Sequence, residues 1–252
     1  MSDTTTRITR KQRKLARKAV IENNVDRSIN GRTGLNMREL KPLTKNQERV
    51  FDAYYDGQHI FLSGFPGTGK SFLAIGLAIE DILVEKCPQE KVIIVRSVVP
   101  SRAMGFLPGS ERQKAAVFEL PYKHIFTELF GRGDAYSILK SKGLVEFETT
   151  SFLRGNTFEN ALVIVDECQN MSFQECDTII TRIGDNSRVI FCGDEKQSDF
   201  VYEDEKVGYI HFKRILERMA EFTHINMEID DIVRSGLVKS YIIAKERTKV
   251  TV

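Results

Sequence analysis

The sequence lacks a long apolar run, a paired-cysteine motif and an excess of either charge. No segment approaches the roughly 20 consecutive apolar residues of a membrane-spanning helix. No hydrophobic segment follows the polar, basic start of the chain, as one would in a secretory signal. We therefore expect a cytoplasmic protein without a membrane partner. The cysteines form no CxxC pair and show no metal-ligand spacing, which argues against zinc and favours reduced, buried thiols. They are Cys87, Cys168, Cys176 and Cys192.

The small net charge of +2 is unevenly distributed. Residues 1–21 hold seven Lys and Arg residues against Asp3, a local charge of +6, so the rest of the chain carries −4. A segment of this kind suits a polyanion such as nucleic acid, although a solvated arm that aids solubility has the same composition. The residues up to 42 show no clear period and are predicted to be a linker. We expect a basic arm and linker over residues 1–42 and one core domain over residues 43–252.

The strongest motif is Gly-x-x-x-x-Gly-Lys-Ser at residues 64–71. An apolar run at residues 60–62 precedes it and a helix-like run follows, which predicts strand, phosphate loop and helix. The glycines allow backbone N–H groups to point inward, and the helix directs its positive end at the same place. We expect Lys70 to reach the β- and γ-phosphates and the Ser71 hydroxyl to bind Mg²⁺. A glycine-rich surface turn is the alternative. The predicted nucleotide-binding residues of this motif are Gly64, Phe65, Pro66, Gly67, Thr68, Gly69, Lys70, Ser71 and Phe72.

A second chemical motif ends the apolar run at residues 161–165, where Asp166 and Glu167 follow one another. A buried strand would deliver both carboxylates to the same edge of a sheet as the phosphate loop. Asp166 is predicted to hold Mg²⁺, directly or through water, and Glu167 to act as the general base that polarises the attacking water. A helix cap is the alternative for such a pair.

Four further polar residues lie where a nucleotide site would use them. Gln47 has an amide that can pair with the edge of adenine, although most glutamines at helix starts are exposed caps. Arg96 follows an apolar strand and is a candidate contact to phosphate. Gln197 follows another strand and is a candidate contact to the γ-phosphate or the attacking water. Arg234 lies between a strand and a helix, where a guanidinium can neutralise γ-phosphate charge in its own subunit or a neighbour's; a surface ion pair is the alternative.

The apolar strands predict an α/β fold, because buried runs with polar C-terminal ends are typical of a parallel sheet covered by helices on both faces. Strands are predicted over residues 60–62, 92–95, 144–149, 161–165, 187–192 and 222–228. Helices are predicted over residues 47–55, 71–84, 121–130, 134–142, 172–183, 208–221 and from about residue 235 to 247.

The ordered motifs resemble those of the PhoH-like family of ATP-binding proteins over about residues 43–247. They include turns that a generic phosphate-loop protein lacks, and they lie at residues 64–71, 95–97, 105–109, 152–155, 165–170, 181–184, 193–197 and 231–234. The resemblance implies a single RecA-like P-loop core that binds ATP and Mg²⁺, with Gln47 reading adenine and Gln197 sensing the γ-phosphate. It also implies ATPase activity directed by RNA or DNA, and a homo-oligomer for which a hexameric ring is one arrangement.

Three features depart from the family pattern. Cys168 stands where the family usually has Ala, a change that leaves the carboxylates in place. The nuclease domain that some bacterial relatives carry ahead of the core is missing, so intrinsic RNA cleavage is not expected. A second motor domain is missing too, so unwinding would need an oligomer in which Arg182 or Arg234 completes a neighbour's site. The short form is similar to versions encoded by bacteriophages.

Three functions remain open at this point. The first is an ATPase coupled to binding, translocation or unwinding of single-stranded RNA or DNA, with the basic arm, Arg96, Arg154 and the turn at 105–109 contacting the strand. The second is a nucleotide-gated assembly or binding module with little motor activity. The third is a phosphate-loop kinase, which the adjacent Asp-Glu pair disfavours because it suits activation of water. Phe106, Phe118 and Tyr122 are candidates for stacking on bases, with core packing as the alternative for each.

Overall fold

A computed structural model describes residues 33–83, 87–97, 116–153, 155, 157–194 and 203–248. The expected basic arm, the turn at residues 105–109, Arg154 and Gln197 lie outside the described residues. Within the described parts, strands and helices follow one another in the order predicted from the sequence.

Six strands form one sheet in the order β3-β2-β4-β5-β1-β6, and every neighbouring pair is parallel. This confirms the predicted α/β fold. β5 separates β1 from β4, the two strands that lead into the chemical motifs, in a RecA-like arrangement. Because the strands share one direction, their C-terminal ends meet at one edge of the sheet. The strands are β1 (His59–Gly64), β2 (Lys91–Arg96), β3 (Val145–Thr149), β4 (Ala161–Asp166), β5 (Arg188–Cys192) and β6 (Phe222–Met227).

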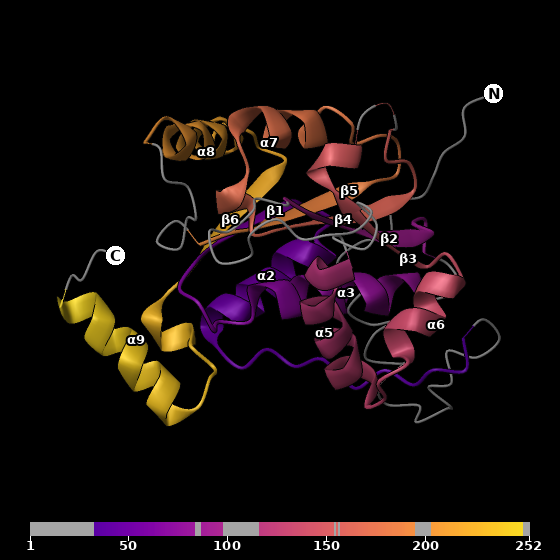
Figure 1. Ribbon diagram of the computed structural model, residues 1–252, viewed down its shortest axis with the longest axis horizontal. Helices are drawn as coiled ribbons and strands as arrows, with labels where there is room; N and C mark the ends of the chain where they lie inside the picture. Colours follow the sequence, from indigo (N-terminus) through magenta and orange to yellow (C-terminus); the bar gives the residue numbers. More distant parts are fainter. Residues whose placement is uncertain are drawn as a thin grey trace.

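Helices cover both faces of the sheet (Figure 1). One part of the hydrophobic core lies under α2, α3, α5 and α6, and the other lies under α7 and α8. With both faces covered, β4 is buried at every position, as expected for a central parallel strand. The helices are α2 (Lys45–Tyr55), α3 (Lys70–Ile82), α5 (Leu120–Phe130), α6 (Ala135–Ser141), α7 (Phe173–Ile180), α8 (Glu203–Leu216) and α9 (Gly236–Thr248), with short 3₁₀ turns η1 (Thr150–Phe152), η2 (Cys168–Asn170) and η4 (Ile229–Asp231).

Two helices differ from the prediction by three or more residues at an end. α7 ends at Ile180 instead of residue 183, because the next residues pair with the segment before β4: the Phe158 N–H donates to Arg182 O and the Gly184 N–H donates to Phe158 O. α8 begins and ends earlier than the run predicted over 208–221. After its last residue, i→i−3 bonds such as that from the Met219 N–H to Leu216 O turn the chain towards β6.

Residues 33–44, the described segment before α2, have no regular secondary structure, yet they contribute to the core. Leu35, Met37 and Leu40 are all buried. Leu40 packs against Gly76 of α3, and the Arg38 N–H donates to the Leu129 carbonyl of α5 at 2.7 Å. The segment lacks a helical or strand period because its apolar side chains follow the shape of the helices that they contact.

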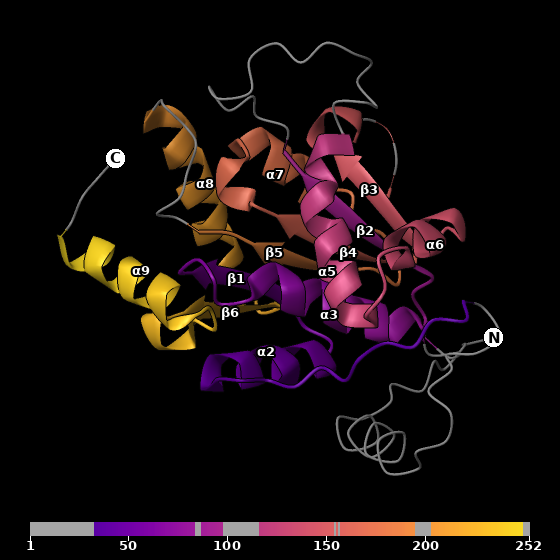
Figure 2. The same ribbon diagram turned by 60° about the horizontal axis from the view of Figure 1, so that its bottom comes forward.

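α9 is the least embedded element of the described chain. None of its residues is buried, and Leu237 and Tyr241 are 82% and 67% exposed. Both ribbon views show α9 projecting away from the sheet and its covering helices (Figures 1 and 2). Among the described helices, including this one, none is both long and apolar enough to cross a bilayer.

Candidate functional site

The loop between β1 and α3 owes its shape to three glycines. Gly64, Gly67 and Gly69 have φ values of 117°, 75° and 84°, in the region that side chains disfavour. Gly64 is also required for steric reasons, because a Cβ at this position would lie 2.1 Å from the Met227 carbonyl oxygen on β6. The phosphate loop therefore depends on the neighbouring strand β6 as well as on its own sequence.

The first turn of α3 faces this loop without a side-chain cap. Its N-cap residue is Gly69, so the N–H groups of the first turn remain available to an anionic ligand. Lys70 extends back across the loop, and its Nζ donates to the carbonyl oxygens of Gly64 and Phe65, both at 2.8 Å. Backbone donors and one cation thus converge where the sequence predicts phosphate.

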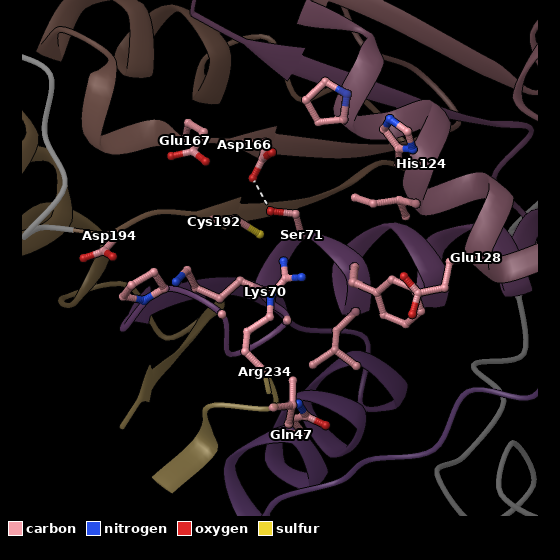
Figure 3. A pocket seen from close by; sticks show the side chains of 18 of the residues that line it. Gln47, Lys70, Ser71, His124, Glu128, Asp166, Glu167, Cys192, Asp194 and Arg234 are labelled. Atoms are coloured by element: carbon pink, nitrogen blue, oxygen red, sulfur yellow. Dashed lines mark hydrogen bonds between the residues drawn. The ribbon is translucent and has the colours of Figure 1, made fainter. Parts of the chain in front are cut away.

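Asp166, at the end of β4, meets Ser71 in the first turn of α3. The Ser71 hydroxyl donates to Asp166 Oδ1 at 2.6 Å (Figure 3). The other carboxylate oxygen, Oδ2, accepts a hydrogen bond from the Tyr122 hydroxyl of α5 at 3.0 Å. Burial raises the pKa of Asp166, and the adjacent charge of Glu167 raises it further, against the opposing effect of these hydrogen bonds. The two residues predicted to bind metal are thus in contact.

Glu167 occupies a turn with left-handed backbone, at a φ of 54° that is uncommon for a residue with a side chain. Its Oε2 accepts a hydrogen bond from Gln169 Nε2 at 2.6 Å. Gln169 is buried, and its Oε1 accepts from the Asp194 N–H at the end of β5 at 2.9 Å. Gln169 therefore ties the carboxylate of Glu167 to a neighbouring strand, a contact that sequence reasoning missed.

Gln47 lies under the loop and is only 2% exposed. Its Oε1 accepts from the Leu43 N–H at 2.7 Å, and its Nε2 donates to the Thr68 carbonyl at 3.1 Å. Both ends of the amide therefore have a backbone partner. A primary amide has two N–H donors and two acceptor positions, so one N–H and one lone pair of the Gln47 amide are still available for a ligand.

Arg234 lies beside the loop on the segment between β6 and α9. The Val233 N–H donates to the Gly67 carbonyl at 3.1 Å, and a Cβ on Gly67 would lie 2.7 Å from Arg234 Cγ. Asp231 fixes this segment to α2, since its Oδ2 accepts from Asn46 Nδ2 at 2.7 Å. Within the described residues Arg234 makes no ion pair, unlike in the alternative considered from the sequence. Arg182 follows α7 before the start of β5, so it lies at the opposite edge of the sheet.

A pocket of about 620 Å³ brings these groups together, within the size range of small-molecule sites. It is lined by the phosphate loop, the ends of β4 and β5, one side of α5, and the segment bearing Arg234. Figure 3 shows Asp166 and Glu167 on one side of Lys70, with Gln47 and Arg234 on the other. Phe72 and Ile125 also line it, and they give it an apolar part.

The donor set fits Mg²⁺ delivered together with a nucleotide. Ser71 and Asp166 offer a hydroxyl and a carboxylate, which are hard oxygen ligands. No cluster of three or more His, Cys, Asp or Glu residues that could hold a metal occurs in the described parts of the chain. Mg²⁺ commonly binds through one or two protein oxygens, water and substrate phosphates, so the pair suits a metal shared with a ligand. No disulfide joins the four cysteines, all of which are among the described residues; Cys168, Cys176 and Cys192 are buried, as predicted, whereas Cys87 is only partly buried.

Tyr122 was noted from the sequence only as a candidate for base stacking. Its side chain is fully buried between α5 and the sheet, which favours the alternative of core packing. What the sequence did not indicate is its hydrogen bond to Asp166, a contact between residues 44 positions apart. A tyrosine just after a proline in the first turn of a helix was the only local signal.

Comparison with known proteins identifies relatives of this chain. A family model described as PhoH-like protein matches residues 39–246. A PhoH-like protein of Synechocystis sp. is 32% identical over 209 residues, which is 82% of this chain and 62% of that protein. A PhoH-like protein of Bacillus subtilis is 28% identical over 211 residues, which is 83% of this chain and 65% of that protein. The chain thus spans about three-fifths of the length of the curated relatives that it matches.

Among solved structures, the helicase domain of Pyrococcus furiosus Hef aligns with a TM-score of 0.43 and 12% identity, covering 75% of this chain and 39% of that one.

Proposed function

The chain belongs to the PhoH-like family, and we propose that it binds ATP with Mg²⁺ and hydrolyses the γ-phosphate. The observation that carries this proposal is the 2.6 Å contact between Ser71 and Asp166, with Lys70 and Glu167 in the same pocket. A phosphate-binding loop, a metal-binding pair and a carboxylate beside them are the parts that phosphoryl transfer to water requires.

The phosphate end of the site would work through positioning. The loop N–H groups bind the β- and γ-phosphates, and Lys70 exchanges its bonds with the Gly64 and Phe65 carbonyls for bonds with phosphate oxygens. Ser71 and Asp166 would hold Mg²⁺, which would supply positive charge against the negative charge that develops on the phosphates. Little covalent chemistry falls to the protein, so geometry and electrostatics supply most of the rate.

The water end of the site would work through Glu167. As general base it accepts a proton from the attacking water, and Gln169 holds its carboxylate in one orientation. Gln197 is proposed to sense the γ-phosphate and so to report hydrolysis. Arg234 is proposed to neutralise transition-state charge, in its own subunit or in a neighbour's. Its place beside Gly67 supports a role at this pocket.

Where the adenine base would bind, Gln47 is proposed to pair with the base edge. It would use the amide N–H and the oxygen lone pair that are not engaged by its two backbone hydrogen bonds. Phe72 would pack against the base or the ribose from the start of α3, since it lines the same pocket. We propose a cytoplasmic location for the protein, because ATP and Mg²⁺ are available in that compartment.

We further propose that single-stranded RNA or DNA stimulates hydrolysis, and that the domain from residue 43 onward works in a homo-oligomer such as a hexameric ring. The local charge of +6 in residues 1–21 supports an anionic polymer as partner. The exposed α9 supports a second copy of the chain as its partner, because it starts directly after the segment bearing Arg234 and leaves Leu237 uncovered. The alternative is a nucleotide-gated assembly with little motor activity, for which the exposed helix is equally suited.

Phosphate release measured with single-stranded RNA, with single-stranded DNA and without either separates these functions. A variant with the seven basic residues of segment 1–21 changed to Gln should keep basal hydrolysis and lose most of the stimulation. Hydrolysis that no strand stimulates would contradict nucleic-acid coupling; ATP-dependent sedimentation would then support the assembly. A phosphorylated small molecule in place of free phosphate would indicate a kinase and contradict the water-activating role of Glu167.

A further inference from the structure

Tyr122 contacts the carboxylate proposed to bind metal, at the end of the sheet where an arginine also lies. Its side chain is fully buried, and its hydroxyl donates to Asp166 Oδ2 at 3.0 Å. Arg96, at the end of β2, lies opposite Asp166 in the register of β2 and β4, and its positive charge acts on the Tyr122 hydroxyl, whose pKa it lowers against the effect of burial. The Phe118 ring lies 5.8 Å from the guanidinium carbon of Arg96 and limits where it can move.

We propose that Tyr122 is a positioning residue that orients Asp166 for Mg²⁺, and that Arg96 acts through Tyr122 instead of contacting the nucleotide. This inference rests on the proposed function, because it assigns support for the metal pair of that same site. It differs from the role predicted for Arg96 from the sequence, which was a contact to phosphate.

Each carboxylate oxygen of Asp166 has a different hydrogen-bond partner. Oδ1 faces Ser71, its partner in metal binding, and Oδ2 is held by Tyr122 from α5. A carboxylate fixed at one oxygen presents the other in a single direction. Such outer partners of metal ligands orient the ligand, and their loss typically weakens metal binding by about 10- to 100-fold.

A tyrosine between the cation and the carboxylate has a physical advantage over a direct ion pair. A guanidinium bound directly to Asp166 would satisfy its charge and compete with Mg²⁺ for the same oxygens. The neutral Tyr122 hydroxyl gives a directional hydrogen bond and leaves the negative charge for the metal. The positive charge of Arg96 polarises that hydroxyl, because charges act strongly on one another in a buried, low-dielectric site.

The test is direct metal binding measured by Mn²⁺ electron paramagnetic resonance with a non-hydrolysable ATP analogue. Tyr122→Phe removes only the hydroxyl and should weaken Mn²⁺ binding about tenfold, while metal-free binding of the analogue stays within about twofold. Tyr136→Phe is the matched control. Tyr136 is equally buried and donates to a carboxylate, Glu119, at 2.9 Å, but it lies on α6 away from the metal pair. Its Mn²⁺ affinity should match that of the wild type.

Arg96→Gln provides a second route should Tyr122→Phe fold poorly. It should weaken Mn²⁺ binding in the same direction, and its effect should shrink in the Tyr122→Phe background, because the two residues act in one chain. Wild-type Mn²⁺ affinity in both single variants would overturn the assignment. Arg96→Gln that weakens metal-free nucleotide binding instead would favour a phosphate contact. If the wild type binds Mn²⁺ and nucleotide but releases no phosphate, the proposed hydrolysis fails while the same titration still decides the role of Tyr122.

Discussion

The Ser71 hydroxyl donates a 2.6 Å hydrogen bond to Asp166 Oδ1, although the two residues are 95 positions apart in the sequence. The contact follows from the order of the sheet. β1 carries the phosphate loop and β4 carries Asp166, with β5 between them. Since all three strands run in parallel, their C-terminal ends bring the loop and the carboxylate to one edge. The chemistry of the pocket is therefore a direct consequence of strand order.

Gly64 should tolerate no side chain. Gly64→Ala places a Cβ 2.1 Å from a backbone oxygen of β6 and forces a side chain into φ 117°, so the free energy of unfolding should fall by about 3 kcal/mol or more. Urea denaturation measures this. Gly133→Ala is the control, because a Cβ there would meet nothing within 4 Å. Equal stability of the two variants would contradict the packing of the loop against β6.

Gln47 should stabilise the protein even without nucleotide. Gln47→Ala leaves the Leu43 N–H and the Thr68 carbonyl without their partner, which should cost about 2 kcal/mol of unfolding free energy. Denaturation in the absence of ATP measures the loss, and Gln174→Ala on the exposed side of α7 should show none. A residue that only reads adenine would leave the stability without ATP unchanged. An unaltered denaturation midpoint in Gln47→Ala would therefore contradict a stabilising role for its two backbone hydrogen bonds.

Arg188 should contribute more to stability than an arginine in an exposed ion pair does. Its guanidinium donates to the Tyr54 carbonyl and to Asp81 Oδ2, both at 2.8 Å, and lies 4.3 Å from the Tyr54 ring centroid. Arg188→Met should lower the free energy of unfolding by about 3 kcal/mol, because the Tyr54 carbonyl and the Asp81 carboxylate each lose a charged hydrogen-bond partner. Arg132→Met breaks an equally short but exposed pair with Asp134 and should leave stability unchanged within error. Similar losses in both variants would contradict this distinction.

His59 should make stability depend on pH. Burial, and then the charge of Arg188, lower its pKa below 6.5, and its Nδ1 accepts a hydrogen bond from the Val189 N–H at 3.1 Å. Below pH 6.5 the His59 imidazole therefore binds a proton more readily in the unfolded chain than in the folded protein. The contribution of neutral His59 to the free energy of unfolding is complete above pH 6.5 and is lost as the pH falls through the folded pKa. His59→Asn should flatten this slope in denaturation curves. His211→Gln, at an exposed position, should keep it, and an unchanged slope in His59→Asn would contradict the assignment.

The local sequence was sufficient to predict the phosphate loop and the carboxylates Asp166 and Glu167. A strand end followed by glycines or paired carboxylates determines the local structure, and a parallel sheet then brings such ends together. The sequence also predicted buried thiols without metal-ligand spacing, and Cys168, Cys176 and Cys192 are buried.

Contacts between distant elements could not be predicted in the same way. The Tyr122 hydroxyl reaches Asp166 only because α5 packs over the end of β4, and a single sequence contains no signal for that placement. Leu35 and Leu40 are buried although their segment has no period, since the helices around them define their environment. The end of α7 is set by pairing with Phe158, a tertiary bond that helix propensity does not contain.

Release of phosphate from ATP in the presence of Mg²⁺, compared between the wild type and Glu167→Gln, tests the central claim most directly. We predict that the wild type hydrolyses ATP and that Glu167→Gln loses about 100- to 10,000-fold in rate while still binding nucleotide, because only the general base is removed. Glu159→Gln, an exposed position before β4, should hydrolyse normally. No hydrolysis by the wild type, or equal rates in the wild type and Glu167→Gln, would contradict the catalytic assignment.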